Sequence, residues 1–168
     1  MGDSKGLKIE AVDQIGYVVR DAEETAKRYW KELGIGPWAI MTVGPGVPHK
    51  IFGKDTSVTC VKIAVAQLGP VSLELVQPIN DAAVHQNFLD EHGEGLHHLG
   101  VFVPSVEEAG EIMRKLGYEE ILSCSNLTPN GGGAAKYFDT RSSMGTLLEF
   151  IEPPSEMPVA KIYPGPGD

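Results

Sequence analysis

A short stretch near the N-terminus, DQIGYVV at residues 13–19, returns in altered form as HHLGVFV at residues 97–103. When the two stretches are superimposed without a gap, Gly16 falls on Gly100 and both stretches end on valine. Internal self-similarity of this kind is the sequence signature of a duplicated structural unit. We therefore interpret the chain as two copies of one module.

The far ends of the two copies match as well. LELVQP at residues 73–78 lies over LEFIEP at residues 148–153, which brings Glu74 onto Glu149. Because both ends of a long unit agree, the boundaries of the copies can be predicted. We expect a first module at residues 1–78, a linker at 79–95, a second module at 96–153 and a tail rich in proline and glycine at 154–168.

Each copy has the same predicted order of elements. A β-rich stretch opens it, an amphipathic helix follows, and three strand-like runs complete it. Asp21 and Ser105 stand where helix N-caps belong, and Gly34 and Gly117 where a helix ends. The sequence thus predicts an α+β fold in which two paired βαβββ modules place curved mixed sheets around a common site.

Four polar residues occupy equivalent places in the two copies. Gln14 matches His98 in the opening strands, and Glu74 matches Glu149 in the closing strands. Side chains alternate between the faces of a strand, so these four share one face if the other packs under the helix. A carboxylate inside a sheet is costly unless it is paired or bound to a metal. We therefore predict that Gln14, Glu74, His98 and Glu149 bind one divalent ion.

The ligand set limits both the metal and the chemistry. Three oxygen ligands and one imidazole suit Ni, Co, Mn, Mg or octahedral Zn rather than an ion that prefers thiolates. An octahedral ion would keep two positions for substrate oxygens, polarise a carbonyl and stabilise an enolate. Glu149 is the predicted catalytic base that moves a proton on the neighbouring carbon.

Composition excludes several classes of partner. The net charge is -9, from 14 Lys+Arg and 23 Asp+Glu, so we expect no binding to nucleic acid. No apolar run is long enough to span a bilayer, and two cysteines are too few for a disulfide scaffold, so we expect a cytoplasmic location without membrane contact. An anionic substrate would need a local basic patch. The loop cations available for it are Lys50, Lys54, Lys136 and Arg141.

With these residues identified, the chain resembles the vicinal oxygen chelate superfamily, which contains glyoxalase I and methylmalonyl-CoA epimerase. The most specific part is the segment from Phe88 to Leu99, which is similar to the epimerase linker and the strand after it. The resemblance covers residues 8–153 and implies paired βαβββ modules, one metal per site and chemistry through an enolate. By position, the four ligands of the family carry over onto Gln14, Glu74, His98 and Glu149.

Several functions remain open at this point. Gln14 together with Glu-His-Glu is close to the ligand set of glyoxalase I, whereas the linker favours an epimerase. We expect an isomerase or epimerase acting beside a carbonyl, or else a lyase on a thiol–aldehyde adduct. A metal-free protein that binds small molecules is a third possibility, and a ring-cleaving dioxygenase is disfavoured because Gln14 replaces a histidine. We expect a small-molecule substrate and a homodimer.

Overall fold

A computed structural model describes residues 7–44, 46–56, 60–80, 83–128, 132–156 and 160–166. Its strands are β1 (Gln14–Val18), β2 (Trp38–Val43), β3 (His49–Ile51), β4 (Lys54–Thr56), β5 (Cys60–Leu68), β6 (Val71–Ile79), β7 (Gly95–Phe102), β8 (Glu120–Ser125), β9 (Ala134–Phe138), β10 (Leu147–Glu152) and β11 (Lys161–Tyr163). Its helices are α1 (Ala22–Leu33), α2 (Ala83–His92), α3 (Val106–Lys115) and α4 (Arg141–Met144).

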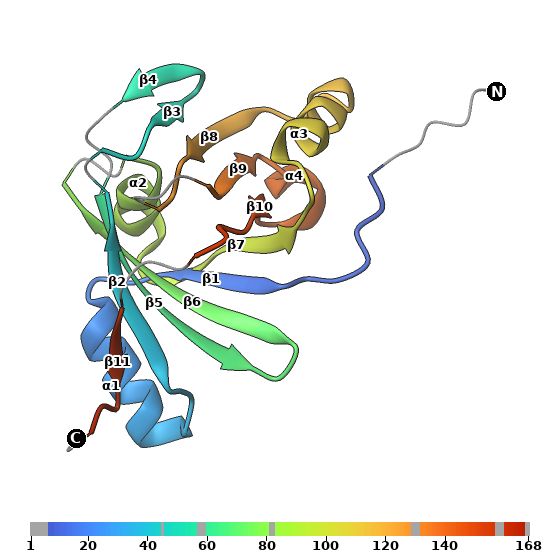
Figure 1. Cartoon of the computed structure of the whole chain (residues 1–168). Coiled ribbons are helices and arrows are strands. Elements are labelled where there is room, and N and C mark those ends of the chain that lie inside the picture. Colours follow the sequence, from blue (N-terminus) through green and yellow to red (C-terminus); the bar gives the residue numbers. More distant parts are fainter. Residues whose placement is uncertain are drawn as a thin grey trace.

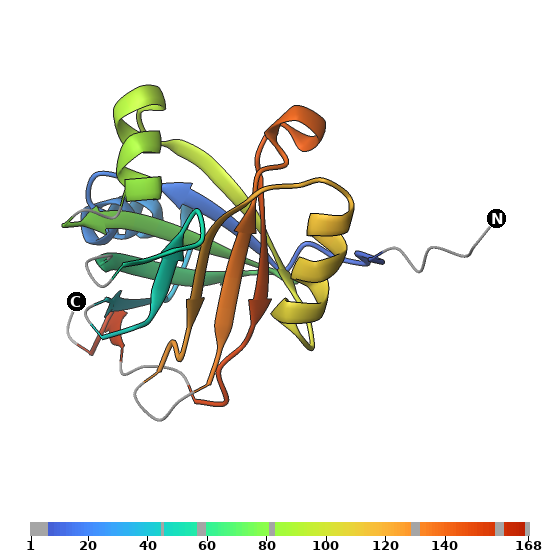
Figure 2. The same cartoon turned by 90° about the horizontal axis from the view of Figure 1, so that it is seen from above.

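The described strands form one mixed sheet in the order β11-β2-β5-β6-β1-β7-β10-β9-β8-β3-β4 (Figure 1). In each half the opening strand lies parallel to the closing strand, β1 beside β6 and β7 beside β10. The halves join where β1 and β7 pair in antiparallel fashion. Seen from above, the sheet curls around a hollow side (Figure 2). The predicted α+β architecture of paired βαβββ units is confirmed.

Helices α1 and α3 begin and end where the sequence predicts. The Asp21 side chain accepts a hydrogen bond from the backbone N–H of Glu24 at 3.0 Å, and Ser105 Oγ caps α3 in the same way. Gly34 ends α1 with φ 68°, a left-handed conformation that favours glycine. No helix in the described part of the chain combines the length and apolar character needed to cross a membrane.

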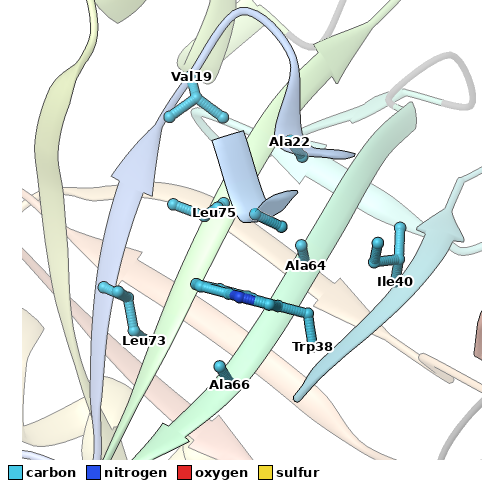
Figure 3. Packing of buried hydrophobic residues seen from close by; sticks show 9 residues of the cluster. Val19, Ala22, Trp38, Ile40, Ala64, Ala66, Leu73 and Leu75 are labelled. Carbon is cyan, nitrogen blue, oxygen red and sulfur yellow. The ribbon is translucent and has the colours of Figure 1, made fainter. Parts of the chain in front are cut away.

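The apolar core lies between these helices and the outer face of the sheet. Ala22 and Ala26 of α1 pack against the fully buried Trp38 and against neighbouring strand residues (Figure 3). Small residues on the helix allow it to lie close to the large indole. In the second half α3 covers Phe138 and Phe150 in the same manner. Burying a large apolar side chain contributes about 1.5–3 kcal/mol, so this packing holds the outer face and leaves the inner face to the site.

Three features depart from the simple repeat. The hairpin β3–β4 leaves the first half and pairs through β3 with β8 of the second half. The expected linker contains α2, which packs through Leu89 onto Val18 and Val76. The composition of the tail predicts a segment that lies extended over the surface or reaches a partner subunit, and within this chain its segment β11 pairs with β2 at the edge of the sheet. The sequence also predicts a strand over residues 57–66, and its first residues, 57–59, lie outside the described part.

Candidate metal centre

Two rows of cross-strand neighbours carry the four predicted ligands. In the first row Gly16 of β1 lies between His98 on β7 and Glu74 on β6. In the second row Gly100 of β7 lies between Gln14 on β1 and Glu149 on β10. Each row therefore consists of two polar residues with a glycine between them, and the rows are related by the internal repeat.

The central glycines are required by close packing rather than by backbone strain. A Cβ atom on Gly16 would overlap the imidazole ring of His98. A Cβ atom on Gly100 would lie 2.9 Å from Gln14 Cβ and 3.2 Å from Gln14 Oε1. The absence of a side chain thus lets the ligand candidates lie over the backbone of the neighbouring strand. This explains why glycine appears at the same place in both copies.

Three of the four predicted residues form a tight cluster. His98 Nε2 lies 3.3 Å from Glu74 Oε2 and 3.2 Å from Glu149 Oε2. One ligand atom from each residue lies within 4.8 Å of the others. Gln14 is on the same face and borders the same cavity as Glu74 and Glu149. The sequence therefore placed all four side chains on the correct face, and their role as ligands stays a prediction.

The cluster contains buried polar atoms without hydrogen-bond partners. His98 is 0% exposed and Glu149 5%, and both His98 Nε2 and Glu149 Oε2 lack a partner among the described residues. Burial alone would lower the pKa of His98, but the carboxylates of Glu149 and Glu74 outweigh it and raise that pKa to about 10. Burial raises the pKa of Glu149, although His98 opposes this. Orphaned nitrogen and oxygen atoms facing one another fit a divalent cation.

Two further side chains orient the cluster. The pairing of β7 with β1 shifts register here, so His97 has no partner on β1, and its Nδ1 lies 3.1 Å from His98 Nδ1. The pKa of His98 is raised to about 10, so both of its ring nitrogens carry protons and Nδ1–H donates to His97, whose pKa burial holds well below its ordinary value. This leaves His98 Nε2 for the carboxylates, as at many metal-binding histidines. On the other side the Tyr137 hydroxyl donates a hydrogen bond to Glu149.

A cavity of about 370 Å³ lies against the cluster on the hollow side of the sheet. Its wall is mainly apolar and is made by strands of both halves, with Val61 and Ile63 from one half and Leu122 and Ile151 from the other. No lysine or arginine is among its lining residues in the described part. The cavity thus suits a small, largely apolar molecule with one polar end.

None of the four loop cations available for an anionic substrate, Lys50, Lys54, Lys136 and Arg141, lines this cavity. Lys136 points to the opposite face, where its Nζ lies 2.7 Å from Glu107. Arg141 forms a two-pronged pair with Asp139, and Lys50 lies 3.8 Å from Asp55. Strand alternation accounts for Lys136, because its neighbours on β9 face the cavity.

Sequence reasoning missed several polar residues of the cavity wall, among them His49, His85 and Tyr137. His49 belongs to the hairpin and His85 to α2, which are additions to the repeat, so the alignment of the copies could not reveal them. Tyr137 stands two residues after Ala135 on β9 and opposite Glu149 across the sheet, a pairing that the sequence alone does not show. Cys60 is buried, as expected for a structural thiol.

Comparison with known proteins agrees with this geometry. Residues 13–135 match the model of the Glyoxalase/Bleomycin resistance protein/Dioxygenase superfamily. The chain belongs to this superfamily. A curated relative, the uncharacterized protein YqjC of Bacillus subtilis (strain 168), is 30% identical over 96 residues. That match covers 55% of this chain and 66% of the relative, slightly less than two thirds of its length.

Solved structures extend the comparison to the whole fold. A methylmalonyl-CoA epimerase variant of Streptomyces coelicolor, in complex with 2-nitronate-propionyl-CoA, superimposes with a TM-score of 0.66 at 19% identity and covers 90% of this chain and 100% of that one. The methylmalonyl-CoA epimerase of Mycobacterium tuberculosis gives 0.61 at 19% identity, covering 89% and 91%. The hypothetical protein BH1468 from Bacillus halodurans C-125 gives 0.58 at 24% identity, covering 88% and 97%. At such identities the likeness shows the fold.

Proposed function

We propose that this protein is a metal-dependent isomerase or epimerase that acts, through an enolate, on a carbon beside a carbonyl. The observation that carries the proposal is the buried cluster in which the unpartnered His98 Nε2 faces the carboxylates of Glu74 and Glu149. Gln14, Glu74, His98 and Glu149 would hold the ion. A divalent ion bound there would act as a Lewis acid toward a substrate carbonyl.

The residues of the chain supply the remaining requirements. Glu149 borders the cavity and is the carboxylate that can take a proton from the substrate carbon. The hydrogen bond from Tyr137 holds that carboxylate in place. The apolar wall excludes water, which strengthens the electrostatic interactions within the site. With no cation in the described wall, the substrate part that fills the cavity should be uncharged, and a negative oxygen should lie at the cluster.

The fold neighbours favour an epimerase over the other candidates, because several of them are methylmalonyl-CoA epimerases. An α-branched acyl thioester is therefore the first substrate class to test. A lyase acting on a thiol–aldehyde adduct is the second candidate, since Gln14 with Glu74, His98 and Glu149 is similar to the ligand set of glyoxalase I. A cytoplasmic location and a homodimer stay predictions from the sequence.

Two measurements test the proposal in sequence. Elemental analysis of the purified native protein should give about one divalent ion per chain, with loss of that ion in Glu149→Gln and retention in His92→Gln, an exposed histidine on α2. A protein without bound metal would instead favour the metal-free binding function.

The metal-loaded protein is then incubated in deuterium oxide with α-methyl acyl-CoA thioesters. Deuterium should enter the α-carbon, as followed by mass spectrometry. If the thioesters show no exchange and the same metal-loaded protein consumes a glutathione hemithioacetal, the epimerase is rejected in favour of the lyase.

A further inference from the structure

His49 reaches the cavity although its strand starts in the first half of the chain. It pairs with Cys124 of β8, which in turn pairs with Ala135 of β9. Ala135 pairs with Ile151 of β10, so one row of cross-strand neighbours runs from His49 to β10. All of these residues border the cavity. His49 and Glu149 therefore face the same enclosed space from different strands.

The ring of His49 is held in one tautomer. His49 Nδ1 lies 2.6 Å from the carbonyl oxygen of Val47, and a carbonyl can only accept a hydrogen bond. Nδ1 must therefore carry the proton, and Nε2 of the neutral ring has a free lone pair. Burial lowers the pKa of His49, which favours this neutral form. A histidine oriented through Nδ1 with its Nε2 free is arranged as a general base.

Epimerisation creates a need for such a group. Inverting a carbon requires removal of a proton from one face of the molecule and delivery of a proton to the opposite face. Glu149 can serve one face only. The other titratable residues of the cavity wall in the described part are Asp13, Glu74, His85, Cys124 and Tyr137.

Each of these five residues is less suited than His49 to transfer a proton at the face opposite Glu149. Asp13 accepts the backbone N–H of Phe102 at 2.8 Å, and Glu74 belongs to the metal cluster. Burial raises the pKa of the Cys124 thiol to about 12. Tyr137 lies directly opposite Glu149 on the neighbouring strand. His85 is buried, and neither ring nitrogen has a partner that would orient it.

We infer that His49 is the second proton-transferring residue of the site and serves the substrate face opposite Glu149, an inference that rests on the proposed function. In one direction His49 Nε2 takes the α-proton, and the C–H electron pair moves to the carbonyl oxygen. The enolate then takes the carboxyl proton of Glu149 on its other face, which forms the new C–H bond. His49 ends as imidazolium and Glu149 as carboxylate, and exchange with water restores both. The reverse reaction exchanges the two roles.

The test separates the two faces. The R and S forms of methylmalonyl-CoA, and of an α-methyl acyl-CoA without the second carboxylate, are incubated separately in deuterium oxide with metal-loaded protein. The variant His49→Asn keeps an amide N–H for the Val47 carbonyl and lacks the basic nitrogen. It should lose epimerisation by about 10²-fold or more, yet keep deuterium wash-in for the one form whose proton faces Glu149. His92→Gln is the matched control and should behave as wild type.

The outcomes distinguish failure of the proposed epimerase function from failure of the role of His49. If wild-type protein exchanges neither form of either thioester, the proposed function fails, whatever His49 does. If wild type exchanges both forms and His49→Asn still epimerises normally, or loses exchange of both forms with its metal content intact, the role of His49 is overturned. His49→Gln provides a second variant should the first not fold. In addition, ring ¹⁵N spectra of the wild-type protein must show protonated Nδ1 and bare Nε2 at His49, and a proton on Nε2 of the neutral ring would equally overturn the inference.

Discussion

Glu74 and Glu149 occupy equivalent positions in the two halves, yet their cross-strand neighbours differ. Glu74 faces Val65 on β5, whereas Glu149 faces Tyr137 on β9, whose hydroxyl donates a hydrogen bond to it. Burial raises the pKa of Glu149, while His98 opposes this. Duplication of the backbone has therefore placed two carboxylates at one site, and the side chains around them give only one of the two a surrounding suited to proton transfer.

The opening strands show the same divergence. His98 and Gln14 are equivalent, and each lies over a glycine of the other half. Only His98 can take up a proton, and it is held by His97 through a shift of register that β1 does not reproduce. A symmetric backbone thus carries an asymmetric set of polar side chains. Four experiments test whether equivalent residues in the two halves differ in function and in their effect on stability.

The largest difference is expected between the two carboxylates. Glu149→Gln should slow α-proton exchange of the substrate form whose proton faces Glu149 by about 10³-fold even at saturating metal, because it removes the proposed base for that face. Glu74→Gln should mainly weaken metal binding, so that excess metal restores most of the exchange. Deuterium wash-in measured over a series of metal concentrations compares them. Equal, unrecoverable losses in both variants would mean that the halves are functionally equivalent.

The two central glycines should differ in their effect on stability. Gly16→Ala forces a methyl group into the His98 ring and should lower the free energy of unfolding by about 3 kcal/mol. Gly100→Ala overlaps its neighbours less deeply, with Gln14 Cβ at 2.9 Å as the nearest atom, and should lower it by about 1 kcal/mol. Gly95→Ala is the control, since a Cβ there meets nothing within 4 Å. Urea denaturation measures all three. If Gly16→Ala proves as stable as Gly95→Ala, the close packing of the imidazole is refuted.

Removal of the Tyr137 hydroxyl tests the polar neighbour that Glu149 has and that its equivalent, Glu74, lacks. Tyr137→Phe should slow exchange by about 10-fold with metal content unchanged, because Glu149 loses the hydrogen bond that positions it. Tyr118→Phe removes a hydroxyl that donates to Ser143 instead and should leave exchange as it is. Similar rates of α-proton exchange in the two variants would show that the Tyr137 hydroxyl does not assist Glu149.

The mildest perturbation is pH, applied to the metal-free protein. The pKa of His98 is raised in the folded chain from 6.5 to about 10, so folding takes up a proton between these values. The resulting stabilisation is complete below pH 6.5 and is lost as pH rises through about 10. Urea midpoints measured in the presence of a chelator should therefore fall over this range. The metal-loaded protein should show less of this fall, because a bound ion takes the place of the proton, and a flat profile without metal would contradict the arrangement around His98.

Local patterns of the sequence predict several features of this structure. The strand alternation around Gln14 and Glu149 and the helix caps Asp21 and Ser105 depend on residues close together in the chain, and the repeat is recognised by comparing two such local patterns. The structure has the caps and the strand faces where they were predicted. These features could be predicted because strand and helix geometry fix which neighbouring side chains share a face.

Tertiary structure alone decided what completes the cavity. The pairing of His49 with Cys124, the register shift at His97 and the packing of α2 over Val18 join segments that no periodicity connects. The same is true of the cation-free wall, because Lys136 could be assigned to the outer face only after the faces of β9 were known. Contacts between distant segments depend on which of many alternative pairings buries the most surface, and a single sequence does not display that competition.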